Sequence, residues 1–457
     1  MSGFSPPQLS SLLEPLLDKV SSRRLCVALS GGLDSMVLLH SLAMLRTEAR
    51  WSLRAVHVNH QLQASAVSWA QQCTDWCSQL SVPCKILTVH VNDIKQQGPE
   101  AAARKARYAA LQAELQPDEV LLTAHHADDQ LETILIALMR GAGLDGLAAM
   151  PALTRFATGW HARPLLEFTR DELQAWAAQQ GLRYVTDPSN DQTRFDRNFL
   201  RHEVIPLLKQ RWPAAAEAGA RSVRHLGEAQ SLLDEYVARD LSTTSQDNTL
   251  DVELLRGWSA ARRHAVIRGW LQNNGVLMPS TRVLHSLEHD MLNSGDDRVP
   301  CSRWGIHAVH RYRGRLYLEK TYQPEQLDDS LPWNWQQPLS LPFYLGALRM
   351  TAGGSLSSAR TAALNAAALP SQLRVAFRSG GERMRLPQES FHRELKTLLH
   401  DNDVLPWWRG RIPLIFADEQ LVAVGHWWVS ADFVASDTQS ARYLQWEHND
   451  SVIFSVN

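Results

Sequence analysis

The sequence predicts a multidomain protein whose first domain is an α/β fold with a parallel sheet. A chain of 457 residues is long enough for two or three domains. Between residues 24 and 141, short apolar segments alternate with segments of helical periodicity. This alternation indicates βαβ units, and polar residues follow several of the predicted strands, where parallel sheets bind their ligands.

The predicted elements follow one another in regular order. Strands are expected at Arg24–Leu29, Leu53–His60, Cys84–Val91 and Glu119–His126, which are rich in apolar and β-branched residues. Helices are expected at Ser35–Leu45, Val67–Leu80, Glu100–Leu115 and Asp128–Gly141. Pro99 suits the first turn of the third helix, and Gly141 suits the end of the fourth.

The composition is that of an ordinary soluble globular protein. The formal net charge is −2, with 44% hydrophobic and 21% charged residues, so an RNA partner would require local basic patches. The cysteines are odd in number and sparse, which argues against a disulfide framework: Cys26, Cys73, Cys77, Cys84 and Cys301. Their CxxxC pair matches neither a zinc site nor a redox site, and the pair is expected to lie away from the ligand-binding loops.

The N-terminal segment lacks the basic start and apolar core of a secretory signal. No apolar run approaches the ~20 residues that a membrane span requires. We therefore expect a cytoplasmic protein with no membrane partner.

The second half of the chain changes in character. Residues Arg194–His225 carry seven Lys/Arg against three Asp/Glu, a local net charge of +4, and helical segments follow. A strand pair turning at Gly314 is expected within Arg303–Lys320. Tyr322–Pro342 contains four prolines and is interpreted as a linker into a mixed-β domain with one helix near Phe391–Asp401.

The hexapeptide "SGGLDS", Ser30–Ser35, follows the first predicted strand and opens the first helix of the alternating region. Glycines let a backbone approach phosphate oxygens, and a helix N-terminus supplies positive potential. Asp34 would repel a phosphate unless a cation lay between them, and magnesium fits this role. The alternative is a Gly-Gly turn with a capping Ser or Asp.

The hexapeptide fits neither GxxxxGK[ST] nor GxGxxG. It resembles the SGGxDS signature of the PP-loop N-type ATP pyrophosphatases, which cleave ATP between the α- and β-phosphates and adenylate a substrate. The resemblance implies magnesium at Asp34 and Asp129. It also implies an ATP site built from Ser30, Gly31, Gly32, Leu33, Asp34, Ser35, His57 and Asn59.

A second cluster lies in "AHHADDQLET", where Asp128, Asp129 and Glu132 can share one helical face. They could bind magnesium or a cationic amine at the strand ends. The alternative is a set of capping acids on a solvated helix. The adjacent His125 and His126 should point to opposite faces and line the nucleotide pocket, without forming a zinc site.

Four motifs together resemble those of the tRNA(Ile)-lysidine synthetases. They are "AHHADDQLET", "GPEAAARKARYAAL", "HVNHQL" with Gln61 at a usual glycine position, and "DPSNDQTRFDRNFLRHEVIPLL". The resemblance implies that Arg104, Arg197 and Arg201 face tRNA or triphosphate charge. The alternative for these arginines, and for Arg107, is a solvated face.

The C-terminal region resembles the substrate-binding domain of the longer members of this family. The expected tRNA-binding residues are Arg383, Arg385, Lys396, Trp407 and Arg409, since cations among aromatics suit phosphate contact and base stacking. The alternative is that Trp407 and Trp408 belong to the core and that the charges form a solvated face.

The resemblance implies a Rossmann-like parallel-sheet catalytic domain of PP-loop type at 1–212, a mainly helical tRNA-contacting domain at 213–325 and a small α+β tRNA-binding domain at 335–457. The implied reaction uses ATP to ligate L-lysine to C2 of the first anticodon cytidine of tRNA(Ile) with a CAU anticodon. Lysidine, AMP and pyrophosphate form through an adenylated cytidine, and the codon read changes from AUG to AUA. The expected catalytic residues are Asp34, Arg104, Asp128, Asp129, Glu132, Arg197, Asn198 and Arg201.

Two alternatives stay open at this stage. One is a PP-loop tRNA thiolation enzyme, which would usually need reactive cysteines. The other is a non-enzymatic, nucleotide-responsive RNA-binding protein. The sequence also leaves a homodimer open.

Overall fold

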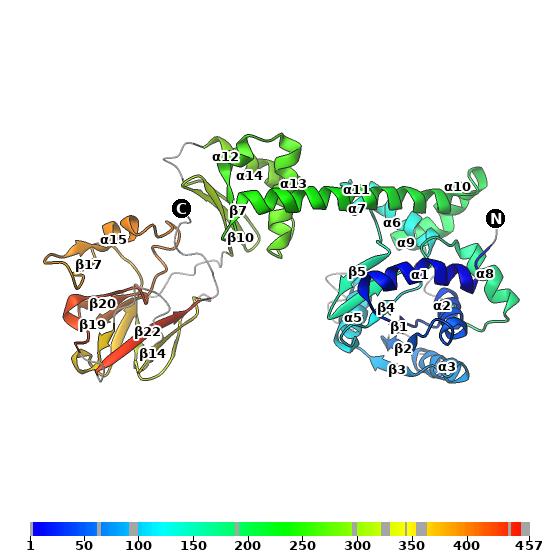
Figure 1. Cartoon of the computed structure of the whole chain (residues 1–457), viewed down its shortest axis with the longest axis horizontal. Coiled ribbons are helices and arrows are strands. Elements are labelled where there is room, and N and C mark those ends of the chain that lie inside the picture. The colour runs from blue at the N-terminus through cyan, green and yellow to red at the C-terminus, as the bar shows by residue number, and fades with distance from the viewer. Residues whose placement is uncertain are drawn as a thin grey trace. The chain divides into compact units, whose positions relative to one another are not determined.

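The computed structural model describes residues 3–61, 65–90, 99–187, 192–294, 299–320, 330–342, 345–352, 363–436 and 440–448. The chain divides into two compact units, Met1–Leu233 and Asp234–Asn457, coloured in sequence order in Figure 1. Each unit is considered by itself. Ser189 and Asn190 of the fourth motif lie outside the described residues.

The first unit is built on a six-stranded sheet of order β3-β2-β1-β4-β6-β5. Neighbouring strands run parallel except for the β5–β6 pair, so the predicted parallel sheet is confirmed. The strands are β1 (Arg24–Ala28), β2 (Ser52–Asn59), β3 (Cys84–Thr88), β4 (Val120–Leu122), β5 (Leu153–Phe156) and β6 (Gly159–Ala162). The strand order reverses direction at β1 and β4, and such a switch point is where open α/β sheets bind ligands.

Helices α2 and α6 begin just after the two central strands. The helices of this part are α1 (Pro6–Val20), α2 (Leu33–Leu45), α3 (Ala66–Gln79), α5 (Pro99–Glu114), α6 (Ala127–Met139), α7 (Leu144–Leu147) and α8 (Arg170–Gln179). Helix α2 packs against α1 and α8, so apolar residues occupy most of its circumference.

Two predicted strands are longer than the observed ones. β3 ends at Thr88 and β4 at Leu122. Residues 123–126 leave the sheet because His126 is the N-cap of α6, with its amide donating to Asp129 Oδ2 at 3.0 Å. The expected end of α6 is confirmed, with Gly141 at a φ of +67° just beyond it.

A basic helical segment follows the sheet. It comprises α9 (Asp196–Phe199), the π-helical turn η2 (Leu200–Val204) and α10 (Ile205–Arg211). Pro206 has no N–H to donate to the preceding turn, which accounts for the irregular hydrogen bonding there. Helix α11 (Ala215–Thr244) begins in the first unit and ends in the second.

The second unit begins with helices packed on a five-stranded sheet of order β7-β8-β11-β10-β9. The helices are α12 (Val252–Arg256), α13 (Ala260–Asn273) and α14 (Thr281–Asn293), and the strands are β7 (Ser245–Gln246), β8 (Thr249–Asp251), β9 (Cys301–Trp304), β10 (His307–Tyr312) and β11 (Arg315–Lys320). β10 and β11 confirm the predicted strand pair, with Gly314 at a φ of +74° in its turn.

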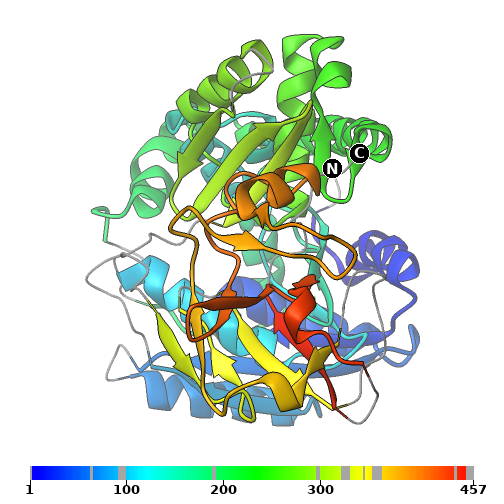
Figure 2. The same ribbon diagram turned by 90° about the vertical axis from the view of Figure 1, so that its left-hand side faces the viewer.

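The C-terminal region contains small antiparallel sheets, drawn from yellow to red in Figure 2. Its strands are β12 (Leu331–Trp333), β13 (Leu339–Ser340), β14 (Ala347–Thr351), β15 (Leu364–Asn365), β16 (Leu373–Ala376), β17 (Arg383–Met384), β18 (Arg393–Glu394), β19 (Leu414–Ala417), β20 (Gln420–Val424), β21 (Trp428–Val429) and β22 (Ala441–Glu447). Its helices are the 3-10 turns η3 (Ala366–Ala368) and η4 (Ala431–Phe433) and the α-helix α15 (Leu395–Asp401). The single predicted α-helix is confirmed.

The prediction that Tyr322–Pro342 is only a linker is wrong for its described part. β12 pairs with β16, and the Trp333 side chain is buried in the C-terminal core. Prolines are compatible with an edge strand, and β12 is at the edge of its sheet. The predicted domain boundaries at 212, 325 and 335 stay predictions.

Within the described residues, no helix combines the length and apolar character that crossing a bilayer would need.

Two helical glycines should respond oppositely to alanine. A Cβ at Gly269 would lie 2.4 Å from Val237 Cγ1, whereas a Cβ at Gly227 would meet nothing within 4 Å. We expect Gly269→Ala to lower the free energy of unfolding by about 1–3 kcal/mol through overpacking. Gly227→Ala should raise it by about 0.5–1 kcal/mol through helix propensity. The urea unfolding midpoints of the two variants measure these changes. Equal effects of the two substitutions would contradict the close packing of Gly269 against Val237.

Candidate active site

The loop Ser30–Ser35 joins β1 to α2, and glycine is required at its second position. Gly31 has a φ of +83°, and a Cβ there would lie 2.9 Å from Cys73 Sγ. Gly31 O accepts a hydrogen bond from Val185 N at 2.9 Å. The turn is therefore fixed by both its backbone conformation and its neighbours.

Hydroxyl groups close the loop from within. Ser30 Oγ and Ser35 Oγ lie 2.9 Å apart, and Gly32 N donates to Ser30 Oγ at 3.2 Å. Ser35 Oγ also lies 2.9 Å from Gly32 O, to which it donates. Gly32 is the N-cap of α2, so the loop is held at a helix N-terminus, where backbone amides and the helix dipole favour an anion.

His57 and Asn59, at the carboxyl end of β2, support the polypeptide around this loop. His57 Nδ1 lies 2.8 Å from Leu29 O, and burial lowers the pKa of this histidine. Asn59 Oδ1 accepts from Gln61 N at 2.9 Å. Gln61 has a φ of +55°, so the chain keeps here a conformation that glycine adopts readily.

The expectation that Cys73 and Cys77 lie away from the loops is wrong for Cys73. Its Sγ lies 3.5 Å from His57 Nδ1 and beside Gly31. Both thiols are fully buried, and burial raises the pKa of Cys73 to about 12. A buried, protonated thiol is a poor nucleophile, so chemistry argues against sulfur transfer here even though the distance to the loop is short.

The carboxylates Asp128, Asp129 and Glu132 gather at the N-terminus of α6. Asp129 caps the helix, as the alternative interpretation expected, but the three residues are only 7%, 8% and 0% exposed. They do not lie on a solvated face. Buried carboxylates need partners, and the structure supplies them.

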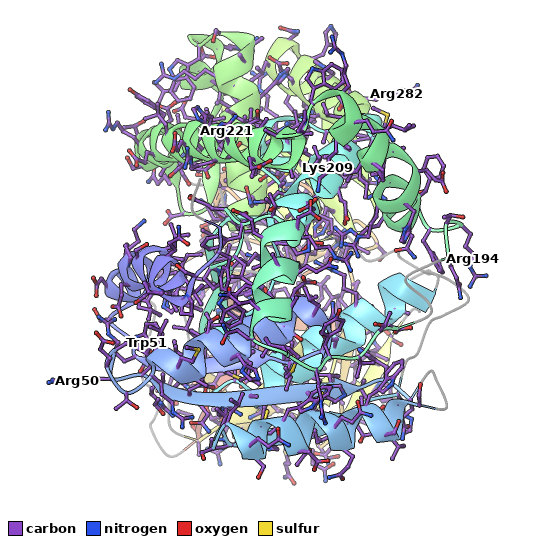
Figure 3. All side chains as sticks on the ribbon, turned by 90° about the vertical axis from the view of Figure 1, so that its right-hand side faces the viewer. Arg50, Trp51, Arg194, Lys209, Arg221 and Arg282 are labelled. Atoms are coloured by element: carbon purple, nitrogen blue, oxygen red, sulfur yellow. The ribbon has the colours of Figure 1, made fainter. Side chains whose placement is uncertain are left out.

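Cations from the α9–α10 segment neutralise this cluster. Arg201 Nε donates to Glu132 Oε1 at 2.6 Å, and its Nη2 donates to Asp129 Oδ1 at 3.0 Å. Arg197 Nε lies 3.3 Å from Glu132 Oε2. Lys209 Nζ, on a side chain labelled in Figure 3, lies 2.7 Å from Asp128 Oδ1.

These contacts exclude one of the two interpretations of the arginines in this segment, and the expected contact with tRNA or triphosphate charge stays a prediction. Arg197 and Arg201 point into the carboxylate cluster, so the alternative of a solvated face is wrong for them. Their charge is balanced by acids of the same chain, which the sequence interpretation did not anticipate. Asn198, between them, donates to Gln192 O at 3.1 Å.

The cluster contains carboxylates with opposite pKa shifts. Burial pushes the pKa of Asp129 up, but the neighbouring His126, His125 and Arg201 outweigh it and hold the value at about 2. Burial raises the pKa of Glu132, and the nearby Asp129 acts in the same direction. Asp129 is therefore a persistent anion, and Glu132 is better suited to take up a proton.

His126 connects this cluster to the loop. Its Nε2 lies 3.8 Å from Asp34 Oδ2 and 3.4 Å from Asp129 Oδ2. Asp34 and Asp129 therefore lie near one another, at the ends of the neighbouring strands β1 and β4.

The residues present fit the magnesium ion that the sequence motif implies. Asp34 Oδ1 is buried and has no hydrogen-bond partner among the described residues. An orphaned carboxylate oxygen near a second carboxylate provides the hard oxygen ligands that magnesium prefers. Burial also raises the pKa of Asp34, and a bound cation would offset the cost of ionising it.

A polar cluster beside this site was missed by the sequence analysis. Thr123 Oγ1 lies 2.8 Å from both His125 Nδ1 and His161 Nε2, and Arg163 Nη2 lies 3.1 Å from His161 Nδ1. Burial lowers the pKa of both histidines to about 3. His125 thus contacts different partners from His126, and the expectation that the two rings face opposite sides stays a prediction.

Arg104 remains on the exposed surface of α5, with its guanidinium 5.2 Å from the Tyr108 ring centroid. The position of His161 at the end of β6, next to β4, could have indicated its place beside His125. Lys209 lies eight residues after Arg201 in the same basic segment, and this helical spacing could have indicated that it faces the same carboxylates.

The predicted C-terminal residues divide into two groups. Arg383 and Lys396 are exposed, while Arg385 pairs with Asp432. Arg409 Nε donates to Val404 O at 2.9 Å.

The core alternative holds for Trp408, whereas Trp407 is only half-buried and its contact with tRNA stays a prediction. Trp408 is 3% exposed, and the Trp407 ring is stacked on His310 with centroids 4.1 Å apart. Tyr317 contacts the Trp407 ring edge to face. One face of Trp407 is therefore already covered within the second unit.

Replacing Asp34 with Asn should stabilise the fold at neutral pH without divalent cations. The pKa of Asp34 is raised on folding, so its ionisation costs stability as pH rises through that value, and the cost persists above it. We expect the urea midpoint of Asp34→Asn to match the unchanged chain in acid and to exceed it at pH 7. Glu419→Gln, on a side chain that is 96% exposed, is the control and should show little difference. A gap that widens toward acid would contradict this account.

Comparisons with known proteins extend these observations to the whole chain. A PP-loop domain model matches residues 6–208, a TilS substrate binding domain model matches 250–317, and a TilS substrate C-terminal domain model matches 373–446. The match to the structure of the U34-tRNA thiolase from Methanococcus maripaludis covers 48% of this chain and 80% of that chain at 17% identity, with a TM-score of 0.38.

Curated relatives match over nearly their full length. The tRNA(Ile)-lysidine synthase of Shigella flexneri is 41% identical over 93% of this chain and 96% of its own. Those of Escherichia coli O157:H7 and Coxiella burnetii are 40% and 35% identical, each over 94% of this chain and over 98% and 94% of their own. The chain, which carries the loop, the carboxylate cluster and the C-terminal region in one polypeptide, belongs to the tRNA(Ile)-lysidine synthase family.

Proposed function

We propose that this protein uses ATP to join L-lysine to C2 of the cytidine at the first anticodon position of tRNA(Ile), whose anticodon is CAU. The products are lysidine, AMP and pyrophosphate, and the modified tRNA reads AUA instead of AUG. The main observation behind this proposal is that the loop at the start of α2 and the acids at the start of α6 meet around His126. Family membership supplies the substrate class.

The loop is the proposed phosphate site. The amides at the N-terminus of α2 and the hydroxyls of Ser30 and Ser35 would bind ATP phosphates. Magnesium held by Asp34 and Asp129 would neutralise phosphate charge during the reaction. The buried, hydrogen-bonded His57 would keep the loop in place.

The chemistry proceeds in two substitutions. The O2 atom of cytosine attacks the α-phosphorus, and pyrophosphate leaves. The amine of lysine then attacks C2, and AMP leaves with the electron pair of the C2–O bond. Adenylation converts a poor leaving group into a good one, so one difficult substitution becomes two easier ones.

The α6 carboxylates are the proposed site for lysine. Asp129, with a pKa of about 2, would pair with an ammonium group of the substrate. The attacking amine must lose a proton, and the carboxylates of this cluster are the candidate bases. Arg201 would orient both carboxylates through its hydrogen bonds.

The tRNA would be held by local positive charge, since the net charge of the whole chain is −2. Exposed Arg383 and Lys396 are suited to phosphate contact, as is exposed Arg104 on α5. A cytoplasmic location and a homodimer stay predictions.

The reaction is tested by incubating the full chain with ATP, labelled lysine and unmodified tRNA(Ile). We expect label in the tRNA, and none with elongator tRNA(Met). Asp34→Ala should lower incorporation at least ~100-fold, because charge stabilisation at the phosphates is lost. Gly227→Ala, in open space, is the matched control. Absence of label in the tRNA, or an unimpaired Asp34→Ala, would contradict the proposal.

In the C-terminal region, an exposed residue and a packed residue should differ in whether they contribute to tRNA binding or to stability. Lys396→Ala should weaken tRNA binding, reduce its salt dependence by about one counterion and leave stability unchanged. Trp407→Ala should lower the free energy of unfolding by about 3 kcal/mol, because it removes a ring packed on His310 and Tyr317. Filter binding at several salt concentrations and urea unfolding measure the two effects. A Trp407→Ala chain that keeps full stability but binds tRNA poorly would contradict this packing role and support base stacking on Trp407.

A further inference from the structure

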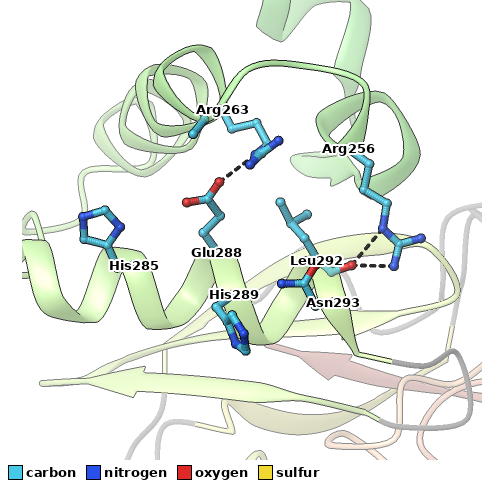
Figure 4. A pocket seen from close by; sticks show the side chains of 8 residues that line it. Arg256, Arg263, His285, Glu288, His289, Leu292 and Asn293 are labelled. Carbon is cyan, nitrogen blue, oxygen red and sulfur yellow. Dashed lines mark hydrogen bonds and ion pairs between the residues drawn. The ribbon is translucent and has the colours of Figure 1, made fainter.

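A second group of titratable side chains lies in the second unit, between helices α13 and α14. His264 is on α13, and His285 and Glu288 are three residues apart on one face of α14. Each residue offers one possible ligand atom, a ring nitrogen or a carboxylate oxygen, and these three atoms all lie within 4.8 Å of one another. Figure 4 shows His285 and Glu288 on α14 beside Arg263.

The two oxygens of Glu288 have different partners. Oε1 accepts from Arg263 Nε at 2.6 Å, and Arg263 Nη1 donates in turn to Trp258 O at 2.6 Å. Oε2 contacts His264 Nε2. One oxygen is thus fixed by an arginine, and the other is directed at the histidine. A metal ion would replace the contact between Glu288 Oε2 and His264 Nε2, while Arg263 would keep the carboxylate in place through Oε1.

The cluster borders a cavity of about 500 Å³. Two arginines line this cavity, but each is engaged by the protein. Arg263 binds Glu288, and Arg256 Nε donates to Leu292 O at 2.8 Å and pairs with Glu253. These contacts disfavour an anion site and leave the imidazoles of His264 and His285 as the ligand groups next to Glu288.

We propose that His264, His285 and Glu288 bind a divalent transition-metal ion of the zinc class. Two imidazoles and one carboxylate form a ligand set of intermediate softness, which suits zinc better than magnesium. Bonds of about 2.0–2.1 Å place tetrahedral ligands roughly 3.3 Å apart, so the exposed His285 ring would turn inward on binding. The fourth position would face the cavity and accept water.

The site would connect α13 to α14 and would be independent of the proposed active site. Its ligands belong to the second unit, whereas Asp34 and Asp129 belong to the first. Because a histidine binds a metal only through an unprotonated ring nitrogen, protons should compete with the metal for this site.

The test is a cobalt(II) titration of the full chain, first stripped with a chelator and kept in excess magnesium to saturate oxygen-only sites. All variants carry Cys301→Ser, because this exposed thiol near His310 could bind cobalt. We expect one equivalent of cobalt to give visible d–d bands of tetrahedral intensity, and zinc to displace it. His285→Ala should weaken binding at least tenfold.

His289→Ala is the matched control, since His289 lines the same cavity on the same helix but lies outside the cluster. His289→Ala should bind cobalt as tightly as the parent chain does. Zinc should raise the thermal unfolding midpoint of the parent chain and of His289→Ala, but not that of His285→Ala. Absence of stoichiometric binding, or equal affinity in His285→Ala, would overturn the proposal. Lysine incorporation into tRNA, measured in parallel, should stay unchanged in His285→Ala, so the two proposals fail separately.

Discussion

Burial of three carboxylates at the start of α6 is the constraint on which the first unit depends. A buried ionised group that lacks a partner costs several kcal/mol, so cations must reach these acids from elsewhere in the chain. Arg197, Arg201 and Lys209 do so from α9, η2 and α10. The pairing fixes the basic segment onto the sheet domain, and it keeps Asp129 ionised at a site where water is largely excluded.

The sheet topology determines where this cluster lies. β1 and β4 are neighbours, so the turn after β1 and the helix after β4 begin side by side. The first carries Asp34, the second carries Asp129, and His126 lies between them. A helix N-terminus suited to phosphate and a group of acids thus share one end of the sheet. In the proposed function, this proximity would let one site bind a nucleotide and a cationic amine together.

Local patterns in the sequence were enough to predict much of this arrangement. The βαβ alternation, the glycine loop and the acids of α6 each depend on residues close together in the chain. Partners distant in sequence could not be predicted in this way. The pairing of Arg201 with Glu132, the place of Cys73 beside Gly31 and the stacking of Trp407 on His310 all depend on tertiary packing. The same is true of Trp333, which lies in a proline-rich stretch yet is buried in a sheet.

A double-mutant cycle on Arg201 and Glu132 tests this central constraint most directly. The measured quantity is the free energy of unfolding of Arg201→Met, Glu132→Gln and the double variant. If Arg201 compensates the buried Glu132, its loss should cost about 3–5 kcal/mol in the unchanged chain and at least about 1 kcal/mol less in the Glu132→Gln background. Equal costs of Arg201→Met in both backgrounds would show that the two charges are not coupled and would contradict the account.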